Sequence, residues 1–123
     1  MPMNDKKLLG RWGEERAAEY LQKKRYRIVG RNFSCRFGEI DVIAEDRAYL
    51  AFVEVKLRKN AAFAQAREFV TASKQQKLIA TAQFWLTRHP TGKQPRFDVI
   101  EIYAPHGAAG DIEINHIENA FGL

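Results

Sequence analysis

The sequence predicts an α/β domain in which a mixed β-sheet is flanked by helices. Segments with apolar residues at helical spacing alternate with segments in which every second residue is apolar. Their order along the chain is helix, three strands, helix and two strands, which is typical of a sheet with helices packed against it. The chain has 123 residues, the length of one ordinary domain, so we expect residues 1–123 to form a single unit.

The first predicted element is a helix over residues 5–24. Its apolar stripe contains Leu9, Trp12, Ala17, Tyr20 and Leu21. Asn4 or Asp5 can cap the first turn, and basic residues in the last turn suit the helix dipole.

Strands are expected where apolar and β-branched residues alternate with polar ones. They cover residues 26–33, 38–45, 49–57, 96–103 and 111–117. The short polar segment Asp46-Arg47 between the second and third strands predicts a β-hairpin. Residues 118–123 are expected to form a loosely docked tail.

A second helix is predicted from Ser73 to about His89. Ser73 is a suitable N-cap, Gln76 stands at the capping-box position, and Pro90 ends the helix. The preceding residues 58–72 fit either a loop or a short helix.

The composition limits the classes of function. The formal net charge of +5 and the pI of 9.5 fit a nucleic-acid ligand, although many basic proteins bind no nucleic acid. Cys35 is the only cysteine, which excludes an internal disulfide and a CxxC zinc motif and fits a reducing compartment; we expect a bystander rather than a catalytic thiol. No segment approaches the ~20 apolar residues of a membrane span, and no signal-peptide run begins the chain. We therefore expect a cytoplasmic protein that does not bind membranes.

The predicted strand over residues 49–57 carries an unusual pair of charges. Alternate residues of a strand share a face, so Glu54 and Lys56 lie on the same face as Leu50 and Phe52. Both faces of this strand are otherwise apolar, which is typical of a central, covered strand. Because burial of an unpaired charge is costly, Glu54 and Lys56 must neutralise each other or hold a ligand.

The preceding strand adds a second carboxylate. If the hairpin pairs Ala44 with Tyr49, Asp41 lies opposite Phe52 and diagonal to Glu54 on one face of the sheet. A register slip of one residue would separate the two carboxylates. Together they would suit Mg²⁺ or Mn²⁺, which can activate a water and neutralise a scissile phosphate. Spacing alone leaves a second interpretation open, in which Glu54 and its lysine form only a buried ion pair.

Several short motifs occur in a fixed order over nearly the whole chain. They are Gly10-x-x-Gly13-Glu14-x-x-Ala17, Tyr20-Leu21, Arg31-Asn32-Phe33, Gly38-Glu39-Ile40-Asp41-Val42-Ile43, Phe52-Val53-Glu54-Val55-Lys56 and Arg96-Phe97-Asp98-Val99. In combination they resemble the bacterial YraN family, also called uncharacterised protein family 0102. That family is similar to archaeal Holliday-junction resolvases and to the PD-(D/E)xK nucleases, so the resemblance implies a restriction-endonuclease-like fold. Ile40 stands where many such nucleases have a proline, a departure that affects the metal site little.

The resemblance also implies roles for individual residues. Asp41 and Glu54 would bind Mg²⁺ or Mn²⁺ together with the backbone carbonyl of Val55. Lys56 would position or activate the attacking water. Glu14 would hold a second metal or an outer-shell water, unless it is only a solvated helix charge. These residues would hydrolyse DNA phosphodiester bonds, on branched or structured DNA if the likeness to resolvases extends to the substrate.

Basic residues that flank the proposed site in sequence are the candidate nucleic-acid contacts. They are Arg31, Arg36, Arg58, Lys59, Lys74 and Lys77. No motif for base readout is visible, so we expect recognition of the DNA backbone or its structure. The resemblance favours a homodimer, because a resolvase cuts two strands symmetrically.

Two other classes of function remain open. The chain could be a nucleic-acid-binding module in recombination or repair, with a nuclease fold and no significant catalysis. It could also be a structural protein in which Glu54 and Lys56 form only an ion pair.

Overall fold

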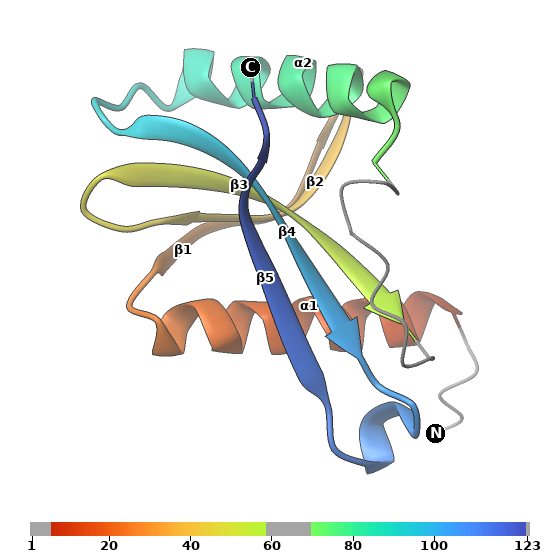
Figure 1. Cartoon of the computed structure of the whole chain (residues 1–123). Helices are drawn as coiled ribbons and strands as arrows, with labels where there is room; N and C mark the ends of the chain where they lie inside the picture. Colours follow the sequence, from red (N-terminus) through yellow and green to blue (C-terminus); the bar gives the residue numbers. More distant parts are fainter. Residues whose placement is uncertain (1–5, 59–69, 123) are drawn as a thin grey trace.

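The computed structural model describes residues 6–58 and 70–122, in which one five-stranded sheet lies between two α-helices (Figure 1). The elements are α1 (Lys6–Lys23), β1 (Arg27–Cys35), β2 (Gly38–Glu45), β3 (Tyr49–Arg58), α2 (Ala72–Arg88), β4 (Gln94–Tyr103), the short 3₁₀ helix η2 (Gly107–Ala109) and β5 (Glu113–Phe121). The predicted α/β class and the order of helices and strands are thus confirmed. None of the helices in the described part of the chain is long and apolar enough to cross a membrane.

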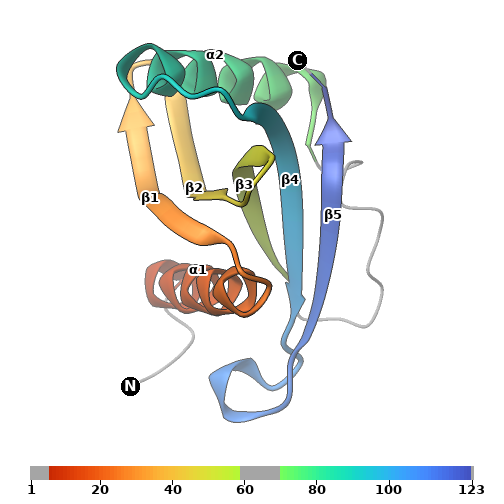
Figure 2. The same cartoon turned by 90° about the vertical axis from the view of Figure 1, so that its left-hand side faces the viewer.

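The sheet is mixed. Strands follow one another in the order β1-β2-β3-β4-β5, and only β3 and β4 run parallel. Parallel neighbours need a crossover connection, and α2 lies within it on one face of the sheet. Helix α1 covers the opposite face, so that the molecule has three layers (Figure 2).

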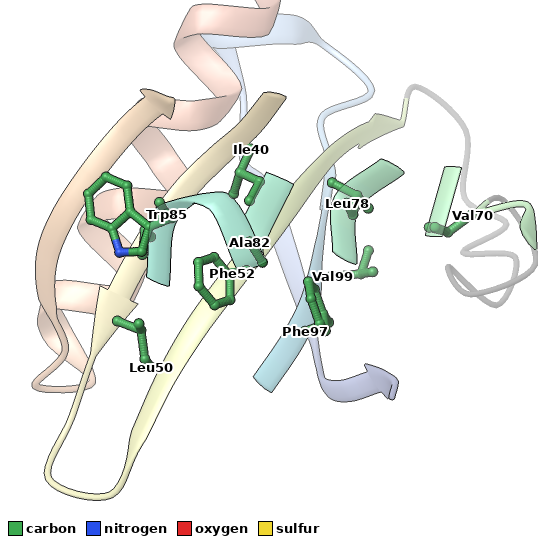
Figure 3. Close-up of a cluster of buried hydrophobic side chains, with 10 residues drawn as sticks. Ile40, Leu50, Phe52, Val70, Leu78, Ala82, Trp85, Phe97 and Val99 are labelled. Atoms are coloured by element: carbon green, nitrogen blue, oxygen red, sulfur yellow. The ribbon is translucent and has the colours of Figure 1, made fainter. Parts of the chain in front are cut away.

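Each face of the central strands contributes to a separate core. On the α2 side, Leu78, Ala82 and Trp85 pack against Phe52, Phe97 and Val99 of the sheet (Figure 3). On the α1 side, Ala17 and Leu21 pack in a cluster with Val53, Ile100 and Ile102. The predicted double coverage of β3 is therefore confirmed, and any charge on this strand must be stabilised locally.

Several predicted boundaries need correction. Thr71, not Ser73, is the N-cap of α2, and its side chain accepts a hydrogen bond from the N–H of Lys74 at 3.1 Å. The loose tail predicted for residues 118–123 is wrong up to Phe121, because β5 continues along β4 to that residue. The candidate caps Asn4 and Asp5, and residues 59–69 of the ambiguous segment, lie outside the described residues.

The register of the β2–β3 hairpin differs by two residues from the predicted one. Ala44 pairs with Ala51 rather than Tyr49, because the connection holds more residues than the two predicted. The carboxylate of Asp46 accepts hydrogen bonds from the N–H groups of Ala48 and Tyr49 at 3.0 and 2.8 Å, which stabilises the wider turn. A shift of two residues keeps every side chain on its predicted face, unlike a shift of one.

Candidate functional site

Strands β2 and β3 pair only part of the way from their hairpin. The ladder runs from Glu45 and Leu50 to Val42 and Val53, after which β2 leads toward α2 and β3 toward the N-terminal end of α1 (Figure 1). The next residue of β2 is Asp41, whose Oδ2 accepts the backbone N–H of Val55 at 2.8 Å. A side chain thus replaces the backbone ladder where the strands separate. We call this place, with Asp41 and Glu54 at its centre, the fork.

Glu54 is buried at the fork and is paired with two lysines. The Nζ of Lys74 donates to Glu54 Oε1 at 2.9 Å, and Lys56 Nζ lies 3.8 Å from the same oxygen. Lys74 comes from the first turn of α2, so the structure adds a cation from another element to the predicted strand pair. The sequence predicts Lys74 as a nucleic-acid contact, and polar residues at the start of this helix can reach the site in related nucleases; the pairing with Glu54 itself depends on how α2 docks.

The two lysines respond differently to their surroundings. Burial lowers the pKa of Lys56, and the neighbouring Lys74 adds to that decrease. Burial also acts to lower the pKa of Lys74, but its hydrogen bond to Glu54 and the charge of Glu54 outweigh this and raise it. Lys56 is therefore the lysine that gives up a proton more readily, as expected for a group that exchanges protons with water.

Asp41 is the most perturbed carboxyl group at the fork. Burial and the charges of Glu54 and Glu14 raise its pKa to about 7, although the Val55 N–H and Lys74 act in the opposite direction. At neutral pH this carboxyl is therefore divided between its protonated and ionised forms. The folded protein thus disfavours the charged form of Asp41.

Glu14 of α1 reaches this carboxyl directly. Burial raises its pKa, and the charge of Glu39 adds to the increase, against hydrogen bonds with the side chains of Asn32 and Asp41. A hydrogen bond between two carboxyl groups requires a proton on one of them. The structure therefore brings together all four residues that the sequence analysis assigned to catalysis, namely Glu14, Asp41, Glu54 and Lys56.

A small pocket opens at the fork. It has a volume of about 140 Å³ and is lined by Gly38, Glu39, Asp41, Glu54, Lys74, Lys77 and Leu78. Pockets for drug-sized ligands occupy roughly 300–1,000 Å³, whereas one water takes about 30 Å³ of liquid. This pocket therefore suits an ion with a few waters or a single phosphate group.

The donors at the fork fit Mg²⁺ or Mn²⁺. Carboxylate oxygens are preferred by these hard cations, and Asp41 and Glu54 both line the pocket. In an extended strand the N–H and C=O of one residue point to the same side, so the Val55 carbonyl faces the Asp41 side as well. In the described residues no three His, Cys, Asp or Glu side chains form a metal cluster. Waters and phosphate oxygens would have to complete the shell, which is usual for Mg²⁺.

The other predicted nucleic-acid contacts are distributed unevenly. Lys77 lines the pocket, and Arg36 lies over the exposed ring of Phe37 beside it. Arg31 instead pairs with Glu15 of α1 at 2.9 Å. Arg58 contacts the buried Glu101 of β4 at 3.4 Å. Lys59 lies outside the described residues. The structure therefore places only part of the basic set beside the fork.

A second buried charged cluster escaped the sequence analysis. The Asp98 carboxylate of β4 accepts hydrogen bonds from Nε and Nη2 of Arg96 at 2.8 and 2.9 Å. Nε2 of His116 lies 2.8 Å from Asp98 Oδ2. Asp98 also accepts the N–H of Asn119 at 3.0 Å, and Arg96 donates to the hydroxyl of Tyr26. Burial acts to raise the pKa of Asp98, but the hydrogen bonds from His116 and Arg96 outweigh it and lower the pKa. Opposite charges two residues apart on an apolar strand were the available signal, as they were for Glu54 and Lys56.

The structure thus defines a class of protein, an α/β domain with a mixed five-stranded sheet whose central hairpin opens onto a pocket of carboxylates and lysines. Sequence comparison finds relatives that match nearly the whole of this domain. The chain belongs to Uncharacterised protein family UPF0102, whose profile matches residues 13–102. A UPF0102 protein of Geobacter sulfurreducens is 47% identical over 118 residues, covering 95% of this chain and 91% of the relative. Another from Caldanaerobacter subterraneus is 43% identical over 118 residues, covering 95% and 97%.

Proposed function

We propose that this protein is a metal-dependent endonuclease that hydrolyses DNA phosphodiester bonds at the fork, within a restriction-endonuclease-like fold. The observation that carries this proposal is the convergence of the Asp41 and Glu54 carboxylates with Lys74 in one pocket of phosphate size, with Lys56 Nζ 3.8 Å from Glu54 Oε1 beside it. Branched or structured DNA is the proposed substrate, as for resolvases. Symmetric cutting of such a substrate needs two sites, which a homodimer supplies.

Each residue of the fork has a distinct part in the proposed reaction. Asp41, Glu54 and the Val55 carbonyl would hold Mg²⁺ or Mn²⁺. A divalent ion bound there supplies charge neutralisation at the scissile phosphate and a lower pKa for a bound water. Lys56, half-buried and with a lowered pKa, orients the attacking water or stabilises charge on the phosphate oxygens. Glu14, whose charge adds to the raised pKa of Asp41, would hold a second metal or an outer-shell water.

Cleavage assays test this proposal. Labelled four-way junctions, flapped DNA and single strands are incubated with the protein and Mn²⁺ or Mg²⁺. We expect cleavage by the wild type and a loss of about a hundredfold or more in Glu54→Gln and Asp41→Asn. Glu19→Gln, which changes an exposed carboxylate of α1, serves as the matched control and should cut normally. The proposal fails if the wild type cuts none of these substrates, or if Glu54→Gln cuts as fast as the wild type.

One observation favours a second candidate function, a nucleic-acid-binding module without significant catalysis. The Nζ atoms of Lys74 and Lys56 lie 2.9 and 3.8 Å from Glu54 Oε1, so the protein's own cations can balance the charge of Glu54. In this alternative the basic surface binds DNA and the fork only stabilises the fold. DNA binding without any Mn²⁺ binding that depends on Asp41 and Glu54 would favour it.

A further inference from the structure

An exposed group of aromatic and basic side chains adjoins the pocket. It is formed by the β1–β2 turn and the side of α2 that faces this turn. We call it the aromatic–basic ridge, and its members are Phe33, Arg36, Phe37, Lys77, Phe84 and Arg88.

The three rings of the ridge are packed together, and Phe37 is the one that is exposed. Phe37 and Phe84 meet edge to face with centroids 6.1 Å apart, and Phe33 stacks on Phe84 at 6.2 Å. Phe37 is 38% exposed, and within the described residues only Tyr49 is an equally exposed large hydrophobic side chain, whereas Phe33 and Phe84 are partly buried. The packed rings thus hold the exposed face of Phe37 in place at the surface, where it can contact a ligand.

Two arginines lie over these rings. The guanidinium of Arg36 is 4.8 Å from the centroid of Phe37, and that of Arg88 is 4.7 Å from Phe84. Both arginines are exposed, as is Lys77, while Glu39 is the exposed carboxylate beside them at the pocket rim. The ridge therefore combines three cations with flat apolar surfaces, and the carboxylates of the adjoining pocket are Glu39, Asp41 and Glu54.

The ridge continues the pocket without a break. Gly38, next to Phe37, has φ +150°, and a Cβ there would lie 3.1 Å from the hydroxyl of Thr81, so the turn sits directly on α2. Gly38 and Lys77 both line the pocket. Lys77, Thr81, Phe84 and Arg88 recur at helical spacing on one side of α2. This row is about 17 Å long at the α-helical rise per residue.

We infer that the ridge binds an unpaired DNA strand where it leaves the pocket, with phosphates on Arg36, Lys77 and Arg88 and a base stacked on Phe37. A nucleic-acid strand has both parts that the ridge complements, a polyanionic backbone and flat bases. Bases stacked within a duplex cannot lie on a protruding ring, so the strand bound here is single-stranded. The inference rests on the proposed function, since it takes the strand cut at the fork as the occupant, and it selects flapped or branched DNA over intact duplex.

Binding measured in EDTA separates this inference from catalysis. Fluorescence anisotropy is recorded with labelled oligodeoxythymidine of about 16 nucleotides, the upper site size of a single-strand-binding fold. Phe37→Ala should weaken binding by about fivefold or more, the lower end of the energy of stacking a base on an aromatic side chain. Phe37→Trp should retain the affinity. Tyr49→Ala, an equally exposed ring on the β2–β3 hairpin, is the matched control and should bind as the wild type does.

The salt dependence of the same binding tests the arginines. Arg36→Gln and Arg88→Gln should each reduce the slope of log affinity against log salt by about 0.7, the value for one phosphate of a single strand. Arg47→Gln on the hairpin should leave the slope unchanged. The inference is overturned if Phe37→Ala and Tyr49→Ala bind single-stranded DNA equally well. Cleavage in Mn²⁺ is scored separately, so a protein that binds through Phe37 without cutting contradicts the proposed nuclease activity but supports the ridge.

Discussion

Asp98 and Asp41 are two carboxylates of the same sheet whose pKa values are shifted in opposite directions. Asp98 is buried completely and accepts hydrogen bonds from Arg96, His116 and the backbone of Asn119. Its pKa is lowered, so its charge is well stabilised within the folded protein. This is the arrangement of a structural ion pair, since every buried acceptor has a donor.

Asp41 is partly buried and receives far less support. The Val55 N–H is its backbone donor, while burial, and then the charges of Glu54 and Glu14, raise its pKa to about 7. The two carboxylates therefore differ in support: the charge of Asp98 is stabilised by its donors, whereas the charge of Asp41 is disfavoured in the folded protein. A strongly perturbed carboxyl group that lines a pocket is a candidate functional residue.

Removal of the carboxylate charge should therefore destabilise the protein at Asp98 and stabilise it at Asp41. Asp98→Asn leaves the buried Arg96 with only the half-exposed Glu118 as a counter-charge and should lower the free energy of unfolding by about 3 kcal/mol. Urea denaturation at neutral pH measures this, with Glu19→Gln as the exposed control, for which the change should stay below about 1 kcal/mol. A loss below about 1 kcal/mol for Asp98→Asn would show that the cluster is not a structural pair.

The pH dependence of stability should distinguish the same two residues. Because folding raises the pKa of Asp41 from 3.8 to about 7, its contribution to stability is fully present below pH 3.8 and is lost as the pH rises through about 7. The loss is at most about 4 kcal/mol, from the free energy of one pKa unit. Asp98, with a lowered pKa, loses its contribution only as the pH falls below 3.8.

Unfolding of the metal-free protein between pH 5 and 8, measured in EDTA, checks this sign. Asp41→Asn keeps an acceptor for the Val55 N–H and removes the charge, so it should stabilise the protein at pH 8 and flatten the profile. A wild-type stability that rises with pH over this range would contradict the assigned environment of Asp41.

Lys74 offers the smallest but most specific test of the comparison. Its ammonium is paired with the Glu54 carboxylate and would compete with a metal held there, so Lys74→Gln should tighten Mn²⁺ binding by about fivefold, as expected for a partly exposed ion pair near 1 kcal/mol. Lys77→Gln is the matched control, because Lys77 lines the same pocket and is not ion-paired with Glu54. Weaker Mn²⁺ binding by Lys74→Gln would mean that the lysine supports the ligand set instead of competing with the metal.

Much of the fold could be predicted from the sequence, because the helices and strands follow clear apolar periodicities. Glu54 and Lys56 were identifiable as charges on a covered strand, but the face of Asp41 depended on the parity of the hairpin, which the sequence left open. The exact register did not follow, because it depends on the wider turn that the Asp46 carboxylate stabilises. The N-cap of α2 was predicted at Ser73 instead of Thr71, because threonine and serine are both suitable N-caps and the sequence does not choose between them.

Contacts between distant elements were harder to predict. Lys74 reaches Glu54 only because α2 begins above the fork, and no periodicity encodes that placement. The Asp98 cluster unites side chains from β4 and β5 with Tyr26, at separations of 18 to 70 residues from Asp98 or Arg96. The stacking of Arg36 and Phe37 beside Phe84 depends on how the β1–β2 turn packs on α2, which the local sequence pattern does not encode.

The most direct test of the central claim is calorimetric titration of Mn²⁺ into the DNA-free protein at pH 7, in two buffers of different ionisation enthalpy. The account predicts that binding releases about half a proton, because Asp41 with its pKa of about 7 must ionise to act as a ligand. It also predicts that Asp41→Asn abolishes both binding and proton release, whereas Glu19→Gln changes neither. Absence of Mn²⁺ binding by the wild type, or equal binding by Asp41→Asn, would contradict a cation site at the fork.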